Sequence, residues 1–247
     1  MLIKILTPLA IVIAATILML RLGMIAEKFQ LPVSKLSYIN TQFKYQLLLL
    51  PVAMLVLAAA YALNTSNFSA LAGMGNIAAP AKEVSWMGIA EGESWLNVGS
   101  NLTFFITLAT LSFVYLQFRK TGGANLLLPY LPWVLLFSLM NSFAEEAIFR
   151  IGILVPLFGV IDTSYVLIIS AVAFGAPHLR GMPNGMAGML MAGLLGWILA
   201  KSVLETSGVF WAWGIHFLQD IVIYSALAMA AAKQSRDKLP EAAPALR

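Results

Sequence analysis

The chain has no cysteine among its 247 residues, and only 11% of them are charged. The lack of cysteine excludes disulfide bonds, thiolate metal ligands and a cysteine nucleophile. A soluble domain of this length carries roughly a quarter charged residues, so the scarcity of charge argues against a soluble protein. The net charge of +4 is small, and its loop and C-terminal positions bear on membrane topology. We therefore expect no nucleic-acid partner.

Apolar residues are abundant in this chain. They make up 60% of the chain, and the mean hydropathy is +0.86. Residues 5–20, 94–118, 121–144 and 181–200 carry no charge, and each stretch is near the roughly 20 residues that a helix needs to cross hydrocarbon. The sequence predicts an all-α, polytopic membrane protein with about seven to eight transmembrane helices. The expected spans are residues 3–22, 46–64, 100–118, 130–158, 163–180, 185–203 and 209–232.

Three charges interrupt one of these spans, in the stretch "EEAIFR" that contains Glu145, Glu146 and Arg150. On an α-helix with about 100° per residue, Arg150 lies about 40° from Glu146 and about 140° from Glu145. The i,i+4 order with the acid first favours an ion pair between Glu146 and Arg150. This pattern predicts a structural pair, with Glu145 left free on another face to act as a base.

Two further polar groups lie in late apolar spans. "FGAPH" ends at His178, and "HFLQD" places His216 and Asp220 four residues apart on one helix face. Counted at 1.5 Å per residue from the connection at 159–162, Glu145 and His178 lie roughly 20–25 Å deep, and Asp220 is at a similar depth of roughly 18 Å from the same side. Three helices thus bring two carboxylates and both histidines of the chain to overlapping depths.

Each group also has a purely structural interpretation: a hydrogen-bonded packing histidine, an ion-paired helix brace, or an i,i+4 pair. Their common depth favours a catalytic or ion-binding site. A carboxylate removed from water can act as a general base on a water molecule, and imidazoles can share the proton or polarise a carbonyl. A second polar pair can stabilise an oxyanion. The same groups are candidate zinc ligands, although the HExxH motif is absent, so the cofactor is either zinc or none. The candidate metal ligands are Glu145, His178, His216 and Asp220.

These motifs resemble those of the CAAX-protease and bacteriocin-processing (CPBP or Abi) intramembrane endopeptidases. "EEAIFR" matches the family's EExxxR motif, Phe174 to His178 matches FxxxH, and "HFLQD" matches the final HxxxN/D motif. Asp220 stands where the type II CAAX prenyl endopeptidases tend to have Asn. The glycine-rich stretch 185–213 is similar to the family's small-residue segment, and the resemblance covers about residues 130–225.

The resemblance implies an intramembrane endopeptidase, a metalloprotease by the family's usual label, in which Glu145 and His178 activate water. His216 and Asp220 would then steady the oxyanion or bind a metal. It implies membrane lipid as an environment and a peptide or protein substrate, such as a lipidated or membrane-anchored C-terminus or a peptide precursor. The residues expected to have structural or aligning roles are Glu146, Arg150 and Phe174.

Asp220 is a departure that leaves alternatives open. An ionised carboxylate repels an oxyanion, so Asp220 must hold a proton, orient His216 or bind a metal. Two other functions also fit buried Glu, His and Asp: a proton- or ion-coupled transporter, or an inactive scaffold descended from the protease. The chain shows no internal repeat of the kind common in transporters, and all four polar motif positions are present.

The chain divides into three predicted parts: N-terminal transmembrane helices and amphipathic loops in residues 1–125, a catalytic helical core in 126–232, and a disordered cytoplasmic tail in 233–247. Alternating loop charge predicts an outside N-terminus and a cytoplasmic C-terminus. The expected location is the cell membrane as a multi-pass protein, which is the inner membrane in a bacterium. Residues 86–99 are interpreted as an interfacial segment with Trp86 and Trp95 at headgroup depth, in preference to a substrate-gating lid.

Overall fold

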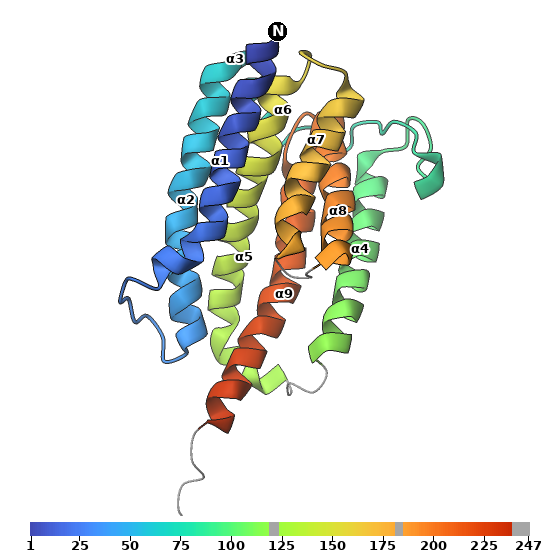
Figure 1. The fold of residues 1–247 in the computed structure, drawn as a ribbon. Helices are drawn as coiled ribbons and strands as arrows, with labels where there is room; N and C mark the ends of the chain where they lie inside the picture. Colours follow the sequence, from blue (N-terminus) through green and yellow to red (C-terminus); the bar gives the residue numbers. More distant parts are fainter. Residues whose placement is uncertain (119–123, 181–184, 239–247) are drawn as a thin grey trace, which may run out of the picture.

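The computed structural model describes residues 1–118, 124–180 and 185–238, and these form an all-α bundle without a sheet (Figure 1). The α-helices are α1 (Leu2–Ala26), α2 (Ser37–Leu63), α3 (Thr65–Leu71), α4 (Trp95–Phe118), α5 (Leu131–Glu146), α6 (Gly152–Leu157), α7 (Thr163–Gly175), α8 (Gly185–Thr206) and α9 (Phe210–Asp237). Short 3₁₀ turns are η1 (Ser85–Met87), η2 (Ala124–Leu126), η3 (Leu128–Tyr130) and η5 (Ala176–Leu179), and η4 (Ala147–Ile151) is a π-helical turn.

Five of the described helices, α1, α2, α4, α8 and α9, are long and apolar enough to cross a membrane. Their outward faces carry large apolar side chains such as Leu55 and Phe105, which suits contact with lipid. The predicted span 130–158 appears as the run α5–η4–α6, and 163–180 as α7 with η5. The prediction of an all-α polytopic membrane protein is confirmed.

Two predicted boundaries were wrong. α2 begins at Ser37, well before residue 46, and α9 continues to Asp237, which places the first residues of the predicted tail in a helix. Lys, Gln and Arg are good helix formers, so a helix can continue beyond the apolar span into water. The tail from residue 239 onward lies outside the described residues.

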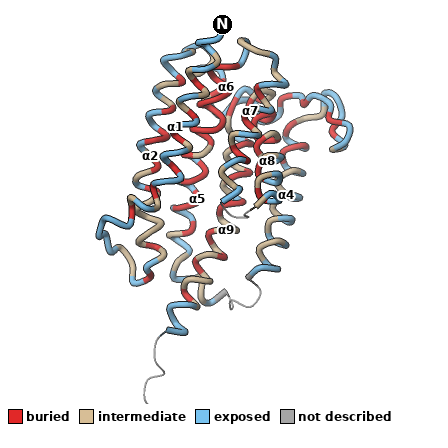
Figure 2. Tube along the Cα trace, viewed as in Figure 1, coloured by how far each residue is buried: buried red, intermediate tan, exposed pale blue. Residues whose placement is uncertain are grey.

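The helices pack as one bundle in which buried side chains gather around α6 (Figures 1 and 2). α1 and α2 lie beside each other and pack on α5 and α6, while α9 packs on α5 and α4. The predicted N-terminal part and catalytic core therefore share hydrophobic contacts. α4 buries the smallest share of its apolar stretch among the five long helices, because it lies at the edge of the bundle.

Helices α7 and α8 approach closely because both carry glycine at their contact. A Cβ added at Gly175 would lie 2.6 Å from the backbone oxygen of Met189 and 3.0 Å from the Cα of Gly193. Small residues allow helix backbones in a membrane to meet at such distances. This contact fixes the end of α7, which carries Phe174 and leads into η5 with His178.

The segment between α3 and α4 folds over one end of the bundle. Trp95 is 0% exposed, and its Nε1 donates a hydrogen bond to Glu205 Oε2 at 2.9 Å. The Trp95 indole thus anchors this segment to α8. Trp86 is 69% exposed, as an interfacial residue would be.

Charge differs between the two ends of the bundle. The α1–α2 loop and the end of α9 lie together at what we call the basic end, and the N-terminus lies at the opposite end with the segment that precedes α4 (Figure 1). The charged residues of the basic end include Lys28, Lys35, Arg236 and Lys238, whereas those of the opposite end include Glu83, Glu91 and Glu93. The arrangement is the one that the positive-inside rule associates with a cytoplasmic basic end.

We expect tags at the two termini to report opposite sides of the membrane. In sealed inside-out vesicles, an added protease should remove a tag fused after Arg247 and leave a tag before Met1 intact. Detergent-opened vesicles, in which both tags should be cut, are the control. Protection of the C-terminal tag in the inside-out vesicles would contradict the orientation.

Replacing Gly175 by Ala should destabilise the protein. Alanine normally favours a helix over glycine by roughly 0.5–1 kcal/mol, so any loss of stability must come from the contact with Met189. Overpacking of this kind costs about 1–3 kcal/mol. Melting in detergent should show a lower melting temperature for Gly175→Ala.

The matched control lies across the same contact. A Cβ at Gly193 would meet its nearest neighbour, the Ala171 carbonyl oxygen, at 3.4 Å, which is ordinary contact. Gly193→Ala should therefore melt at or above the temperature of the parent. A Gly175→Ala protein that melts no lower than Gly193→Ala would contradict the close approach.

Candidate active site

The ion pair predicted from "EEAIFR" is present where α5 passes into the π-turn η4. Arg150 Nε lies 3.0 Å from Glu146 Oε2, and Arg150 is 0% exposed. The Nε–H is not aligned for a hydrogen bond, so the contact is an ion pair by distance alone. The guanidinium also lies over the ring of Phe174, with its Cζ 4.2 Å from the ring centroid.

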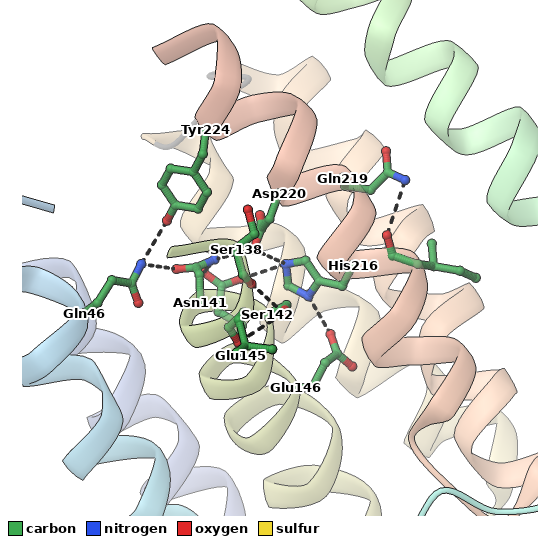
Figure 3. Close-up of polar contacts among 12 residues, drawn as sticks. Gln46, Ser138, Asn141, Ser142, Glu145, Glu146, His216, Gln219, Asp220 and Tyr224 are labelled. Carbon is green, nitrogen blue, oxygen red and sulfur yellow. Dashed lines mark hydrogen bonds and ion pairs between the residues drawn. The ribbon is translucent and has the colours of Figure 1, made fainter. Parts of the chain in front are cut away.

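Glu146 also contacts the histidine of α9. Its Oε1 lies 2.7 Å from His216 Nδ1 (Figure 3). A carboxylate paired with Arg150 accepts hydrogen bonds, so Nδ1 carries the proton and donates it. The other ring nitrogen, Nε2, then faces Glu145 Oε2 at 3.6 Å and Asp220 Oδ2 at 3.8 Å. Glu146 thus orients the imidazole toward the two other carboxylates, a role that second-shell carboxylates commonly have.

Asn141 joins those two carboxylates. Its Nδ2 donates hydrogen bonds to Glu145 Oε1 at 3.2 Å and to Asp220 Oδ2 at 3.1 Å. The two N–H bonds of one amide can serve two acceptors, so Asn141 holds α5 and α9 at a fixed separation. In the sequence, Asn141 is four residues before Glu145 and so shares its helix face, but nothing there indicates the bond to Asp220. The available signal was a polar side chain in an apolar span.

His178 occupies the 3₁₀ turn η5. Its Nδ1 lies 2.9 Å from the carbonyl oxygen of Phe174, and because a carbonyl only accepts, Nδ1 donates the hydrogen bond. The neutral ring then has a lone pair on Nε2. The Phe174 ring packs against both histidines, with centroid distances of 5.2 Å to His178 and 5.5 Å to His216. Phe174 therefore sets the spacing between the two imidazoles.

A cavity of about 570 Å³ brings the four candidate residues together. Glu145, His178, His216 and Asp220 all line it, although His178 makes no direct hydrogen bond to the other three in the part of the chain that the structure describes. Most of its wall is apolar, and most of the lining residues come from α4, α8 and α9. A concave apolar site with a few convergent polar groups is typical of a substrate pocket.

Other polar contacts at this cavity were not predicted. Gln219 bridges α9 to α4, accepting a hydrogen bond from Thr110 at 2.5 Å and donating one to Thr107 at 3.0 Å. Gln46 of α2 donates to Asn141 at 3.3 Å and to Tyr224 at 3.0 Å. Isolated glutamines in apolar spans were the signal that could have drawn attention to them.

The candidate zinc ligands do not form a metal site in this arrangement. Among the residues that the structure describes, no three His, Asp or Glu side chains are grouped so that they could hold a metal ion. We therefore derive no step through a metal.

Comparison with protein families agrees with the motifs. Residues 126–222 match the family model described as type II CAAX prenyl endopeptidase Rce1-like. The predicted resemblance is confirmed. The matched segment contains every motif residue from Glu145 to Asp220, whereas Gln46 and Tyr224 lie outside it. No curated protein and no solved structure matched the chain.

We expect Arg150→Met to lower the free energy of unfolding by roughly 3–5 kcal/mol, because it leaves the buried Glu146 carboxylate without its cation. The double variant Glu146→Gln/Arg150→Met removes both charges and should recover much of that loss. Chemical denaturation in detergent measures both, with the exposed Lys28→Met as control. A double variant no more stable than Arg150→Met would contradict the pairing.

Proposed function

We propose that the protein is an intramembrane endopeptidase that hydrolyses a peptide bond with a water molecule activated by Glu145. The observation that carries this proposal is the convergence of Glu145, His216 and Asp220 around Asn141, on the wall of an apolar cavity that His178 also lines. The match to the CAAX prenyl endopeptidases and the membrane-spanning helices support an intramembrane endopeptidase with a peptide substrate.

In this proposal, Glu145 and His178 activate the water molecule. Asn141 holds one oxygen of the Glu145 carboxylate, and the other oxygen remains available to take a proton from water. His178 presents an unprotonated Nε2 that can accept a hydrogen bond from the same water. The hydroxide attacks the carbonyl carbon of the peptide. The proton held by Glu145 then passes to the leaving nitrogen as the C–N bond breaks.

In this proposal, His216 stabilises the oxyanion. Glu146 fixes the Nδ1–H of its ring, and Nε2 faces the centre of the site. When this nitrogen carries a proton, it can donate to the developing negative charge. Asp220 lies 3.8 Å from Nε2 and is held by Asn141, which favours a role in orienting and charging His216 over direct contact with the oxyanion.

The cavity favours an apolar substrate. Apolar side chains of α4 and α8, among them Phe113 and Met191, cover much of its wall. A peptide with apolar residues or a lipid-modified C-terminus buries this surface favourably. The proposed location is the cell membrane, with lipid next to the cavity walls.

Glu145→Gln, His178→Ala and His216→Ala should each lower kcat by about 10²–10⁴-fold, the usual contribution of acid–base groups. The assay is cleavage of a farnesylated fluorogenic peptide by protein in lipid nanodiscs, with a peptide lacking the lipid as comparison. Melting temperature should change little for Glu145→Gln, because Glu145 is not part of the ion pair with Arg150.

The matched control is Glu27→Gln, which removes an exposed carboxylate next to the end of α1. This variant should cleave like the parent. Substantial cleavage by Glu145→Gln, with folding unchanged, would overturn the proposed role of Glu145.

A further inference from the structure

Polar side chains follow the seam between α2 and α9 from the basic end toward the cavity. Tyr38, Gln42 and Gln46 are four residues apart, so they share one face of α2. At 1.5 Å per residue, this face covers about 12 Å along the helix. An apolar helix that crosses a membrane has little reason to carry three such residues in a row on its inner side.

Two of these side chains, Gln42 and Gln46, belong to a hydrogen-bonded line that reaches the site. Gln42 and Gln46 both donate through Nε2 to the hydroxyl of Tyr224, at 3.2 and 3.0 Å. Gln46 Nε2 also lies 3.3 Å from Asn141 Oδ1, and Asn141 reaches both site carboxylates (Figure 3). The line therefore ends, through Asn141, on the carboxylates of Glu145 and Asp220.

Two cavities lie along the same seam, and one side chain lines both of them. A pocket of about 680 Å³ at the basic end is lined by Tyr38, Gln234 and Asp237. Gln42 and Tyr224 line the central cavity. Leu227 lines both, so its side chain is the partition between the pocket at the basic end and the site.

Two buried polar atoms of the seam have no protein partner among the described residues. They are the hydroxyl of Tyr38 and Oε1 of Gln46, whose side chain is 0% exposed. Buried polar groups are nearly always hydrogen-bonded, and ordered water satisfies those that the protein does not. If these residues served only to hold α2 against α9, both atoms would remain unsatisfied. An ordered water molecule beside each atom would satisfy it.

We propose that the α2–α9 seam carries water from the basic end to Glu145, with Leu227 as the partition that water must pass. The purpose of this route rests on the proposed function, since each peptide bond hydrolysed consumes one water molecule. The largely apolar wall of the central cavity is poorly suited to supply it. Substrate and water would then reach the carboxylates by different paths.

Radiolytic footprinting tests the route without reference to activity, because hydroxyl radicals formed from water modify the side chains beside it. With the full chain in lipid nanodiscs, we expect modification of Tyr38 and of the buried Tyr224. Phe105, which is 64% exposed on α4 but faces lipid, is the matched control and should remain unmodified. Tyr224 as unmodified as Phe105 would overturn the proposal.

Substitutions at Leu227 test whether water reaches Tyr224 by passing this side chain. Leu227→Trp should reduce modification of Tyr224 and leave that of Tyr38 intact, and it should lower kcat for the farnesylated peptide with KM unchanged. Leu227→Ala should increase modification of Tyr224, which keeps the test decisive if the tryptophan variant does not fold. Modification of Tyr224 that is the same in the parent and both variants would overturn the route.

The two proposals fail in distinguishable ways. If modification of Tyr224 changes with the size of the side chain at position 227 but the protein cleaves no peptide, the route is retained and the proposed function is rejected. Peptide cleavage that depends on Glu145, with an unmodified Tyr224 in the parent, would reject the route alone.

Discussion

The rest of the site depends on the contacts of one buried carboxylate, that of Glu146, with Arg150 and His216. A buried guanidinium without an anion is strongly destabilising, so the bundle can enclose Arg150 only with Glu146 beside it. The same carboxylate accepts the Nδ1–H of His216 and so directs Nε2 toward the cavity. One buried charge therefore stabilises the fold and also sets the orientation of an imidazole from another helix.

The helix backbones around this charge are held at short distances by small side chains and by one shared amide. Gly175 lets α7 meet α8, which fixes the position of the turn that carries His178. Asn141 ties α5 to α9 through two carboxylates. The polar groups of the site thus lie on helices rather than on loops, and rigid elements hold reacting groups more closely than loops do. The π-turn η4 adds a local departure from α-helical geometry next to Glu146, of a kind that is frequent at functional sites.

The fold was largely predictable because its signals are local. Long uncharged runs predicted the helices, and the 100° rotation per residue predicted the pairing of Glu146 with Arg150, since both depend only on spacing along the chain. Helix boundaries were less predictable, as α2 and α9 show, because a helix can continue into water without an apolar pattern. The burial of Trp95 was not predictable for a different reason. Its partner, Glu205, is 110 residues away, and no local pattern indicates such a contact.

The sequence by itself determined the membrane class of the protein and the family resemblance, which the family model matches over residues 126–222, and it indicated which polar side chains are candidates for the site. Only the tertiary structure decided which partners each of those side chains contacts. Glu146 serves both an ion pair within its own helix and a histidine 70 residues away, and Asn141 bonds to a carboxylate 79 residues away. Gln46 enters the site from α2, outside every motif. The physical reason is that spacing fixes which residues share one helix face, whereas the packing of glycines, rings and buried charges fixes which faces meet.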